Sequence, residues 1–320
     1  MIIPVFFSID DKYAPYLSVA LCSLIQNASE KNTYKIIILY RKGMLSSENM
    51  GNIISDIPTH FIIEFIDMDD RIETITDRME NRLRCDYFTP TIFYRLFIPA
   101  MFPEYKKAIY LDSDIVVLGD ISDLFQINID NYLLGACNDY FAGEMLENYL
   151  NKFVGVEKEE YFNSGILLMN LEKLRKLNLD EHFLHLYNTY HFECLAPDQD
   201  YLNAMCKGNT LLLSQSWNTM PHSDYDRNAE ENMTGINIVH YFLFFKPWNH
   251  YAIQFEKLFW FYLKQTPYYD MVKSMHQDNV ENAIKSEKVA LETIMSQAEI
   301  VVNNNVTFKK IFESGTERRI

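Results

Sequence analysis

The sequence predicts an α/β fold, in which a sheet of buried strands is flanked by helices. Short apolar runs without polar alternation, typical of strands buried on both faces, occur at Ile2 to Phe7, Tyr34 to Tyr40 and His60 to Ile66. Stretches with helical spacing separate them, and this alternation is the start of a doubly wound sheet. The chain of 320 residues is 48% apolar and 14% aromatic, which is ample for a globular core.

Helix signals follow each of these strands. Pro15 suits the first turn of a helix, and apolar residues recur behind it at helical spacing. Ser46 suits the N-cap of a second helix that runs to Ser55. Thr89-Pro90 combines a capping residue with proline at the first helical position, which predicts a helix through Arg95.

The second half of the chain continues the alternation. Further strands are expected at Leu133 to Cys137, Thr210 to Leu213 and Ile236 to Tyr241. Asn163-Ser164-Gly165 is expected to form a small-residue bend directly before another buried strand. Pro197 begins a helix through Cys206, which Asp198 is expected to cap, with Gln199 and Asp200 in its first turn.

The net charge of −15 argues against a general nucleic-acid binder, which would present a basic face. An anionic substrate would need a cation or a few placed Lys and Arg side chains. The segment from Tyr251 to Ile320 carries nine Lys/Arg and nine Asp/Glu, so the net charge lies in residues 1–250.

The cysteine pattern favours reduced, buried thiols of a cytoplasmic protein. Five cysteines are widely spaced with no Cys-x-x-Cys: Cys22, Cys85, Cys137, Cys194 and Cys206. The opening MIIPVFFSID lacks a basic region and a cleavage site, which favours a strand over a signal peptide. No apolar run approaches the ~20 residues of a membrane helix.

The stretch from Lys106 to Asp120 carries the main chemical signal. Asp112 and Asp114 follow a predicted buried strand and, two residues apart in extended backbone, point the same way. Open α/β sheets bind ligands at this end of their strands, and two carboxylates there suit Mg²⁺ or Mn²⁺ with a phosphate-bearing substrate. For this motif alone, a solvated turn is the alternative interpretation.

Further candidate residues lie elsewhere in the chain. No Gly-x-Gly-x-x-Gly follows the first strand, so a pyrophosphate grip at a helix N-terminus is not expected. Asp10, in the loop after that strand, can accept a hydrogen bond from a base or ribose, or be an ordinary loop carboxylate. Arg95 lies among apolar residues and needs a partner, either an aspartate in a structural salt bridge or the metal-site carboxylates and donor.

His240 and Lys246 stand at the end of the last predicted strand. A histidine at such a position is either a hydrogen-bonded structural residue or, beside a carboxylate pair, a third metal ligand. Neutral imidazole accepts Mn²⁺ more readily than Mg²⁺. Lys246 is a candidate clamp for a diphosphate.

In this order, the motifs resemble glycosyl transferase family 8, the retaining sugar-nucleotide transferases with the GT-A fold. The resemblance covers about residues 2–250 and rests on Tyr94-Arg95-Leu96, Tyr110-Leu111-Asp112-Ser113-Asp114, Phe162-Asn163-Ser164-Gly165, Asp198-Gln199-Asp200, His240-Tyr241 and Lys246-Pro247-Trp248. It implies a Rossmann-like mixed sheet, with a transferase domain at 1–250 and a C-terminal helical extension at 251–320. Lys12 and Leu243 depart from the family pattern, which often has Asn and Gly there.

The resemblance also implies the ligands and the residues that bind them. The donor would be a UDP-sugar, held with Mn²⁺, or Mg²⁺ in its place, by Asp112, Asp114 and His240. Other donor-binding residues would be Ser8, Asp10 and Lys12 around the uridine, with Tyr13, Arg95, Ser113 and Lys246. Asn163, Ser164, Asp198 and Gln199 would line the transferred sugar, and Asp139 the sugar or acceptor, which makes Gln199, Asp198 and Asp139 the catalytic candidates.

The implied reaction moves galactose or glucose to a saccharide or glycolipid acceptor, in cell-surface polysaccharide or lipopolysaccharide synthesis. No carboxylate pair at nucleophile spacing is evident and the Gln199 amide is a poor nucleophile, so front-face attack is favoured, with Asp198 as the alternative nucleophile. The expected location is the cytoplasm, with peripheral association at the inner membrane face through residues 251–320. The alternatives are a haloacid-dehalogenase-type phosphatase using Asp112 and Asp114, and a sugar-nucleotide binder without activity.

Overall fold

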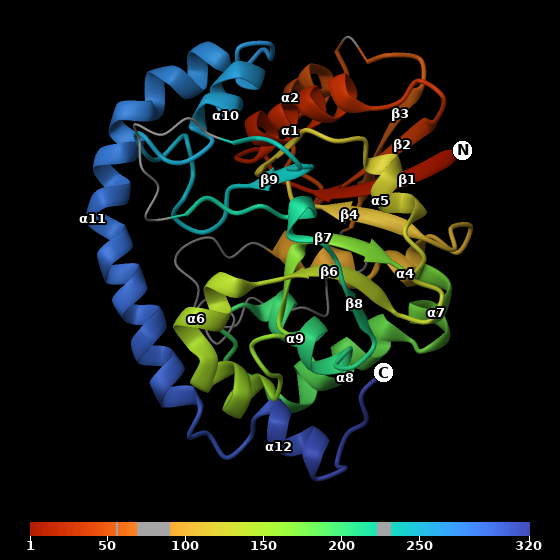
Figure 1. Ribbon diagram of the computed structural model, residues 1–320, viewed down its shortest axis with the longest axis vertical. Coiled ribbons are helices and arrows are strands. Elements are labelled where there is room, and N and C mark those ends of the chain that lie inside the picture. Colours follow the sequence, from red (N-terminus) through yellow and green to blue (C-terminus); the bar gives the residue numbers. More distant parts are fainter. Residues whose placement is uncertain (56, 69–89, 223–231) are drawn as a thin grey trace. The chain divides into compact units, whose positions relative to one another are not determined.

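The computed structural model describes residues 1–55, 57–68, 90–222 and 232–320 (Figure 1). The chain forms two compact units, and each is built from three separate segments. The first unit contains Met1–Asp67, Leu111–Ile127 and Ser214–Lys288, and the second contains Met68–Tyr110, Asn128–Leu213 and Val289–Ile320. A domain boundary at residue 250 stays a prediction.

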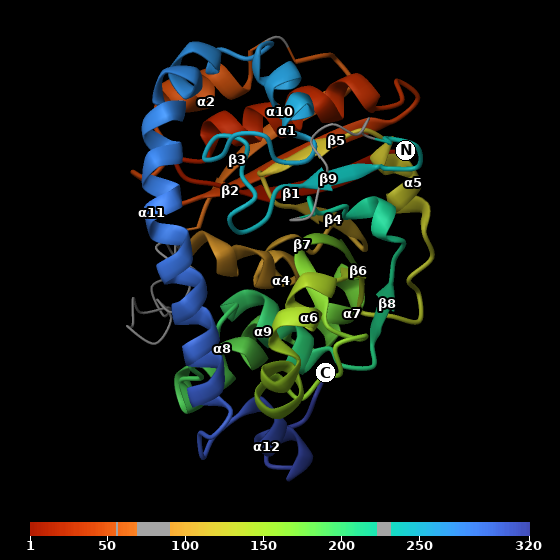
Figure 2. The same cartoon turned by 60° about the vertical axis from the view of Figure 1, so that its left-hand side comes forward.

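The first unit is built on three parallel strands in the order β3-β2-β1. They are β1 (Ile2–Ser8), β2 (Thr33–Tyr40) and β3 (Phe61–Asp67), and Val5, Ile36 and Ile63 lie in register across them. The connections hold α1 (Ala14–Asn27) and α2 (Ser47–Ile53), with Ser46 as the N-cap of α2. The three predicted strands and both helices are therefore confirmed. Figure 2 shows α1 and α2 on the same side of these strands as α10 (Glu256–Leu263).

A short antiparallel pair of strands in the first unit sets the position of His240, the last residue of the last strand. The pair consists of β5 (Ile115–Val117) and β9 (Ile238–His240), with Ile115 directly opposite His240. Because Ile115 follows Asp114 in the chain, this register brings His240 to the two predicted metal ligands. The other elements of this unit are α5 (Ile121–Gln126), η4 (Gln215–Trp217) and the first part of α11 (Tyr269–Val301).

The second unit carries strands in the order β4-β7-β6-β8, with β6 antiparallel to β7 and parallel to β8. The strands are β4 (Ala108–Leu111), β6 (Leu134–Asn138), β7 (Phe162–Met169) and β8 (Thr210–Leu212). Its helices are η2 (Pro90–Leu96), α4 (Ile98–Met101), α6 (Tyr140–Tyr149), η3 (Leu150–Val154), α7 (Leu171–Lys176), α8 (Leu179–Tyr190), α9 (Pro197–Met205) and α12 (Phe308–Glu313). The predicted α/β class with a mixed sheet flanked by helices is confirmed.

Two local predictions are wrong, and a third is confirmed with a 3₁₀ helix. Asn163, Ser164 and Gly165 do not form a bend, because they lie inside β7, where every residue is buried. The helix predicted from Pro90 through Arg95 is present as the 3₁₀ helix η2, and the predicted cap Thr89 lies outside the described residues. Asp198 does not cap α9: Pro197 takes the first helical position, so the N-cap is Ala196 and Asp198 falls inside the helix.

The described cysteines are free thiols. Cys137, Cys194 and Cys206 are buried and Cys22 is half-buried, whereas Cys85 lies outside the described residues. Burial raises the pKa of Cys137 to about 12, so this thiol is held in its unreactive protonated form. None of the helices in the described part of the chain combines the length and the apolar run that crossing a bilayer needs.

Candidate active site

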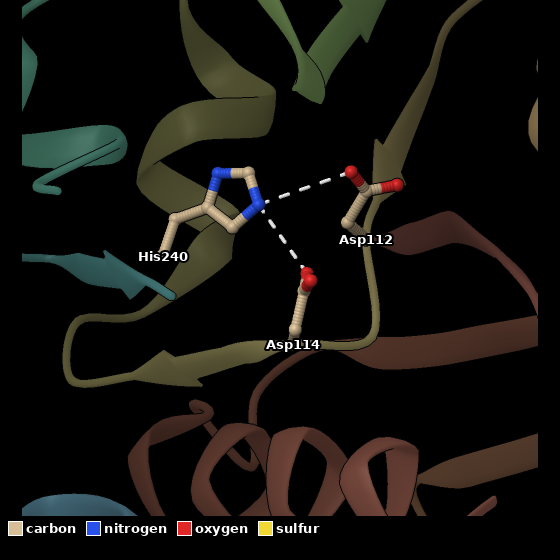
Figure 3. A group of neighbouring side chains, drawn as sticks. All are labelled: Asp112, Asp114 and His240. Carbon is tan, nitrogen blue, oxygen red and sulfur yellow. Dashed lines mark ion pairs between the residues drawn. The ribbon is translucent and has the colours of Figure 1, made fainter. Parts of the chain in front are cut away.

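The first unit brings two carboxylates and an imidazole together. Asp112 and Asp114 lie in the turn between β4 and β5, and His240 faces them from the end of β9 (Figure 3). Nε2 of His240 is 3.3 Å from Oδ1 of Asp114 and 3.8 Å from Oδ2 of Asp112. One ligand atom from each residue lies within 4.8 Å of the others, which suits one metal ion. With Lys246, these residues form what we call the carboxylate-histidine cluster.

The hydrogen bonding of Asp114 tests whether this cluster fits a cation. Its side chain is only 11% exposed, yet in the described part of the chain its Oδ1 atom is buried without a hydrogen-bond partner. A buried carboxylate oxygen left in this way is costly. A divalent cation would satisfy it, since carboxylate oxygens and neutral imidazole are suitable ligands for Mn²⁺. The residues present therefore fit a bound divalent cation.

Lys246 keeps Asp114 ionised. The buried ammonium group of Lys246 pairs with Asp114 Oδ2 and also donates to the carbonyl oxygen of Tyr241. Burial alone would raise the pKa of Asp114, but the charge of Lys246 and the neighbouring His240 lower it below its usual range. The carboxylate is therefore deprotonated, as a metal ligand must be.

Asn218 is part of this region although sequence reasoning missed it. Its side chain is fully buried, and its Oδ1 atom is 3.0 Å from Nδ1 of His240. Nothing in the local sequence marks it, because the contact joins positions 22 residues apart.

The loop after β1 is ordered by the predicted uridine-binding residue Asp10. Its Oδ1 atom accepts hydrogen bonds from the backbone amides of Lys12 (3.0 Å) and Tyr13 (3.2 Å), and burial raises the pKa of the carboxyl group. Asp10 therefore orders this loop, and its contact with a base or ribose stays a prediction. The hydroxyl of Ser8 is buried without a hydrogen-bond partner among the described residues, so it is available to a ligand.

Asn49 and Tyr268, which are not among the predicted site residues, support the loop after β1 through Asp11. The carboxylate of Asp11 accepts hydrogen bonds from the Ser46 amide (2.7 Å) and from the side chain of Asn49 (2.8 Å). The hydroxyl of Tyr268 in turn donates to Oδ1 of Asn49 at 2.8 Å. Sequence reasoning missed Asn49 and Tyr268, because the contact joins residues 219 positions apart.

The backbone between His240 and Lys246 contains an unusual conformation at Leu243. Its φ angle is +43°, in the left-handed region that favours glycine. The family pattern often has Gly at this position, and the leucine here adopts the backbone conformation that glycine would take.

The second unit gathers the other predicted site residues around Ser164. Nη1 of Arg95 donates to the backbone carbonyl (2.5 Å) and hydroxyl (3.1 Å) of Ser164, and lies 3.3 Å from Oδ2 of Asp198. The guanidinium group also lies over the ring of Tyr110, 4.2 Å from its centre. The predicted salt bridge between Arg95 and an aspartate is therefore confirmed.

The same side chains continue into a wider set of hydrogen bonds, which we call the polar network (Arg95, Asp139, Asn163, Ser164, Asp198 and Gln199). Oε1 of Gln199 accepts from the Ser164 amide (3.0 Å), and Nε2 donates to Oδ2 of Asp139 (2.9 Å). Asn163 donates to the same Asp139 oxygen at 3.1 Å. Both ends of the Gln199 amide are thus held, and each member of the network is buried.

Asp200, next to these residues, has a structural role. Its carboxylate accepts hydrogen bonds from the hydroxyls of Tyr149 (2.7 Å) and Tyr161 (2.6 Å) and from the Ala196 amide (2.9 Å). Burial, followed by the charge of Asp200, raises the pKa of both phenols well above the ordinary value. Asp200, and not Asp198, therefore satisfies a free amide at the start of α9.

Comparison with known proteins identifies the family. The family model for glycosyl transferase family 8 matches residues 4–252. A putative glycosyltransferase of Haemophilus influenzae is 32% identical over 72% of this chain and 66% of its own length. The lipopolysaccharide 1,2-glucosyltransferase of Escherichia coli K12 is 27% identical over 56% of this chain and 55% of its own length.

Solved structures show the same fold. The bifunctional glycosyltransferase WbbM has a TM-score of 0.72 at 23% identity, covering 85% of this chain and 51% of WbbM. The galactosyltransferase LgtC, in complex with donor and acceptor sugar analogues, has a TM-score of 0.68 at 24% identity, covering 83% of this chain and 96% of LgtC. These likenesses confirm the predicted GT-A fold.

The chain belongs to glycosyl transferase family 8. The match includes both Asp112-Ser113-Asp114 and His240, so it favours the transferase over the phosphatase that Asp112 and Asp114 alone could suggest.

Proposed function

We propose that the protein transfers a hexose, galactose or glucose, from a UDP-sugar to a saccharide acceptor, with retention at the anomeric carbon. The observation that carries this proposal is the carboxylate-histidine cluster, in which the buried Asp114 Oδ1 has no hydrogen bond from the described residues and lies beside two further candidate ligands. The family match and the GT-A fold support the reaction class.

The first unit holds the residues proposed for the nucleotide. Asp112, Asp114 and His240 would bind Mn²⁺, or Mg²⁺ in its place, which supplies positive charge to the departing UDP. The ammonium group of Lys246 would add to that charge, since it already lies on Asp114. The loop that Asp10 orders would receive the uridine, with Ser8, Lys12 and Tyr13, and Ser113 lies buried between the two carboxylates.

The second unit holds the residues proposed for the transferred sugar and the acceptor. Asn163, Ser164, Asp198 and Gln199 are proposed to line the sugar, with Arg95 ordering them and Asp139 lying toward the sugar or acceptor. Their existing hydrogen bonds support this role, because a site that is already ordered loses little entropy on binding.

We propose front-face attack in preference to a covalent intermediate. The bond from the anomeric carbon to UDP breaks, the acceptor hydroxyl oxygen bonds to that carbon from the same face, and its proton passes to the leaving phosphate. Gln199 is a neutral amide with both ends hydrogen-bonded, and Oδ2 of Asp198 accepts from Ser164 (2.8 Å) beside Arg95. Mass spectrometry that finds a glycosyl adduct on trapped Asp198→Ala or Gln199→Ala protein would overturn this step.

The acceptor class is proposed from the relatives. The name of the Escherichia coli relative refers to lipopolysaccharide, so a cell-surface saccharide or glycolipid is the proposed acceptor. A cytoplasmic location, with peripheral attachment to the membrane through residues 251–320, stays a prediction.

A donor screen tests the proposal. Purified protein with Mn²⁺ is incubated with UDP-galactose, UDP-glucose or UDP-N-acetylglucosamine without acceptor, and released UDP is measured. We expect slow hydrolysis of one UDP-hexose, abolished by EDTA and restored by Mn²⁺, with Asp114→Asn as the inactive control. Metal-independent release, or release of phosphate from an aryl phosphate without use of any UDP-sugar, would contradict it.

A further inference from the structure

The segment before β9 places a buried amide against the imidazole of His240. Asn218 directly follows η4, and the next residue, Thr219, runs along β9: its amide donates to the Ile238 carbonyl, and the His240 amide donates to the Thr219 carbonyl, both at 2.9 Å. These two backbone bonds hold Asn218 beside His240. Asn218 is fully buried and His240 is 3% exposed, so water does not compete at this contact.

The two nitrogens of the imidazole face different partners. Nδ1 lies 3.0 Å from Oδ1 of Asn218, whereas Nε2 faces Asp114 and Asp112. An amide oxygen can only accept a hydrogen bond, so in this arrangement Nδ1 carries the hydrogen and Nε2 presents its lone pair to the carboxylates. Nε2 lies 3.3 Å from Oδ1 of Asp114 and 3.8 Å from Oδ2 of Asp112, so it is the nitrogen that faces the other two proposed metal ligands.

We propose that Asn218 is a positioning residue that selects the Nδ1–H tautomer of His240 and so prepares Nε2 to bind the metal ion. This inference rests on the proposed metal site. A metal-binding histidine needs its ligating nitrogen unprotonated, and the hydrogen bond at its other nitrogen decides which tautomer is present. Asn218 holds the ring in this state and orientation before any metal arrives.

Three variants separate the acceptor from other effects of Asn218. Asn218→Leu keeps a similar volume but has no acceptor, so we expect Mn²⁺ affinity to fall by about 10- to 100-fold. Asn218→Asp keeps an oxygen that accepts from Nδ1–H, and its Mn²⁺ affinity is expected to equal or exceed that of the wild type. Asn237→Ala is the matched control, because the Asn237 side chain donates to Ser216 within η4 at 3.1 Å, so the change removes a half-buried amide contact of the same segment at a different partner.

Two readouts test the proposal without using activity. Calorimetric titration of MnCl₂ into the protein without sugar nucleotide measures affinity, and nitrogen NMR of histidine-labelled protein, assigned with His240→Ala, reports the tautomer in the absence of metal. We expect Nδ1–H in the wild type and in Asn237→Ala. The NMR measurement on the wild type does not depend on Asn218→Leu, so it remains decisive even if that variant does not fold.

The outcomes distinguish this inference from the proposed function. Wild-type affinity in folded Asn218→Leu, an equal loss in Asn218→Asp, or an Nε2–H tautomer in the wild type would each overturn the role of Asn218. If the wild type itself binds no Mn²⁺, the proposed metal site fails, and this inference fails with it. If the wild type binds Mn²⁺ and Asn218→Leu does not weaken it, only the inference fails.

Discussion

The carboxylate-histidine cluster of the first unit and the polar network of the second use similar side chains but satisfy them differently. In the polar network, Arg95, Asp139 and Gln199 all have protein partners, and both ends of the Gln199 amide are held. In the carboxylate-histidine cluster, Oδ1 of Asp114 is buried without a hydrogen bond among the described residues.

This difference teaches which kind of ligand each region is built for. A region whose polar atoms are already paired can order a neutral, hydroxyl-rich ligand at its edge without first needing a counter-charge. A region that leaves one oxygen of a buried carboxylate without a hydrogen bond, beside an imidazole, suits a cation, because an unsatisfied buried polar atom is costly. We therefore expect the cluster to respond to metal and the network to be insensitive to it.

The largest expected effects come from replacing the two carboxylates of the cluster. Both replacements should lower activity, but only one should lower stability strongly. Asp112→Asn and Asp114→Asn should each lower the kcat/KM for the UDP-hexose by about 100-fold or more, since each removes a metal ligand. Asp114→Asn should also lower the free energy of unfolding by about 3–5 kcal/mol, because Lys246 is left as a buried charge. Activity assays with Mn²⁺ and urea unfolding in EDTA measure the two effects.

Asp112→Asn is the control for stability, because the Asp112 side chain is 28% exposed, against 11% for Asp114. Its free energy of unfolding should change by less than about 1 kcal/mol. An equal loss of stability in the two variants would show that the pairing of Asp114 with Lys246 is not what distinguishes them.

The second prediction tests whether the stability of the polar network is independent of metal. Arg95→Met leaves the carboxylate of Asp198 buried without its cationic partner, so the free energy of unfolding should fall by about 3–5 kcal/mol, equally with Mn²⁺ and with EDTA. Asp198→Asn in the same chain should recover part of this loss, which a double-mutant cycle in urea measures. A loss that depends on metal would contradict the distinction between the two regions.

The third effect concerns the loop after β1 and depends on pH. Because burial raises the folded-state pKa of Asp10 above 3.8, its contribution to stability is present below pH 3.8 and is lost as pH rises through the raised pKa. Asp10→Asn does not titrate and can still accept the amide bonds of Lys12 and Tyr13. At pH 7 we expect it to be as stable as the wild type or more stable, within about 1 kcal/mol, as urea unfolding measures.

Asp10→Asn also separates stability from binding. If Asp10 contacts the uridine as a charged acceptor, UDP affinity measured by calorimetry falls while stability does not. A variant with unchanged UDP affinity would leave Asp10 with its loop-ordering role alone. A stability advantage that shrinks between pH 4 and pH 7 would contradict the pKa argument.

The smallest effect lies at Leu243, in the loop that brings Lys246 to the cluster. Its φ of +43° disfavours a side chain, so Leu243→Gly should be more stable than Leu243→Ala by about 1 kcal/mol. Leu243→Ala keeps the Cβ atom and is therefore the matched control in thermal unfolding. The opposite order would show that the left-handed conformation is not the source of the difference.

Sequence alone determined much of this protein. Because strands buried on both faces are continuously apolar, β1 and β2 could be predicted from their own residues; β3 was predicted in the same way, although it lies at the edge of the sheet and only Phe61 in it is buried. The spacing of Asp112 and Asp114 indicated that both carboxylates face one spot, although they lie in the turn between β4 and β5 and not in extended backbone. The ordered motifs were enough to indicate the family. Each of these signals lies within a few neighbouring residues.

Only the tertiary structure decided the rest, because it depends on pairings between distant segments. The register of Ile115 with His240 brings the imidazole to the carboxylates, and the contact of Asn218 with His240 has no local signal at all. At α9, Asp198 and Asp200 look interchangeable in the sequence. Arg95, which comes from η2, pairs with Asp198 and makes it part of the polar network. The hydroxyls of Tyr149 and Tyr161 donate to Asp200, which is therefore a structural residue.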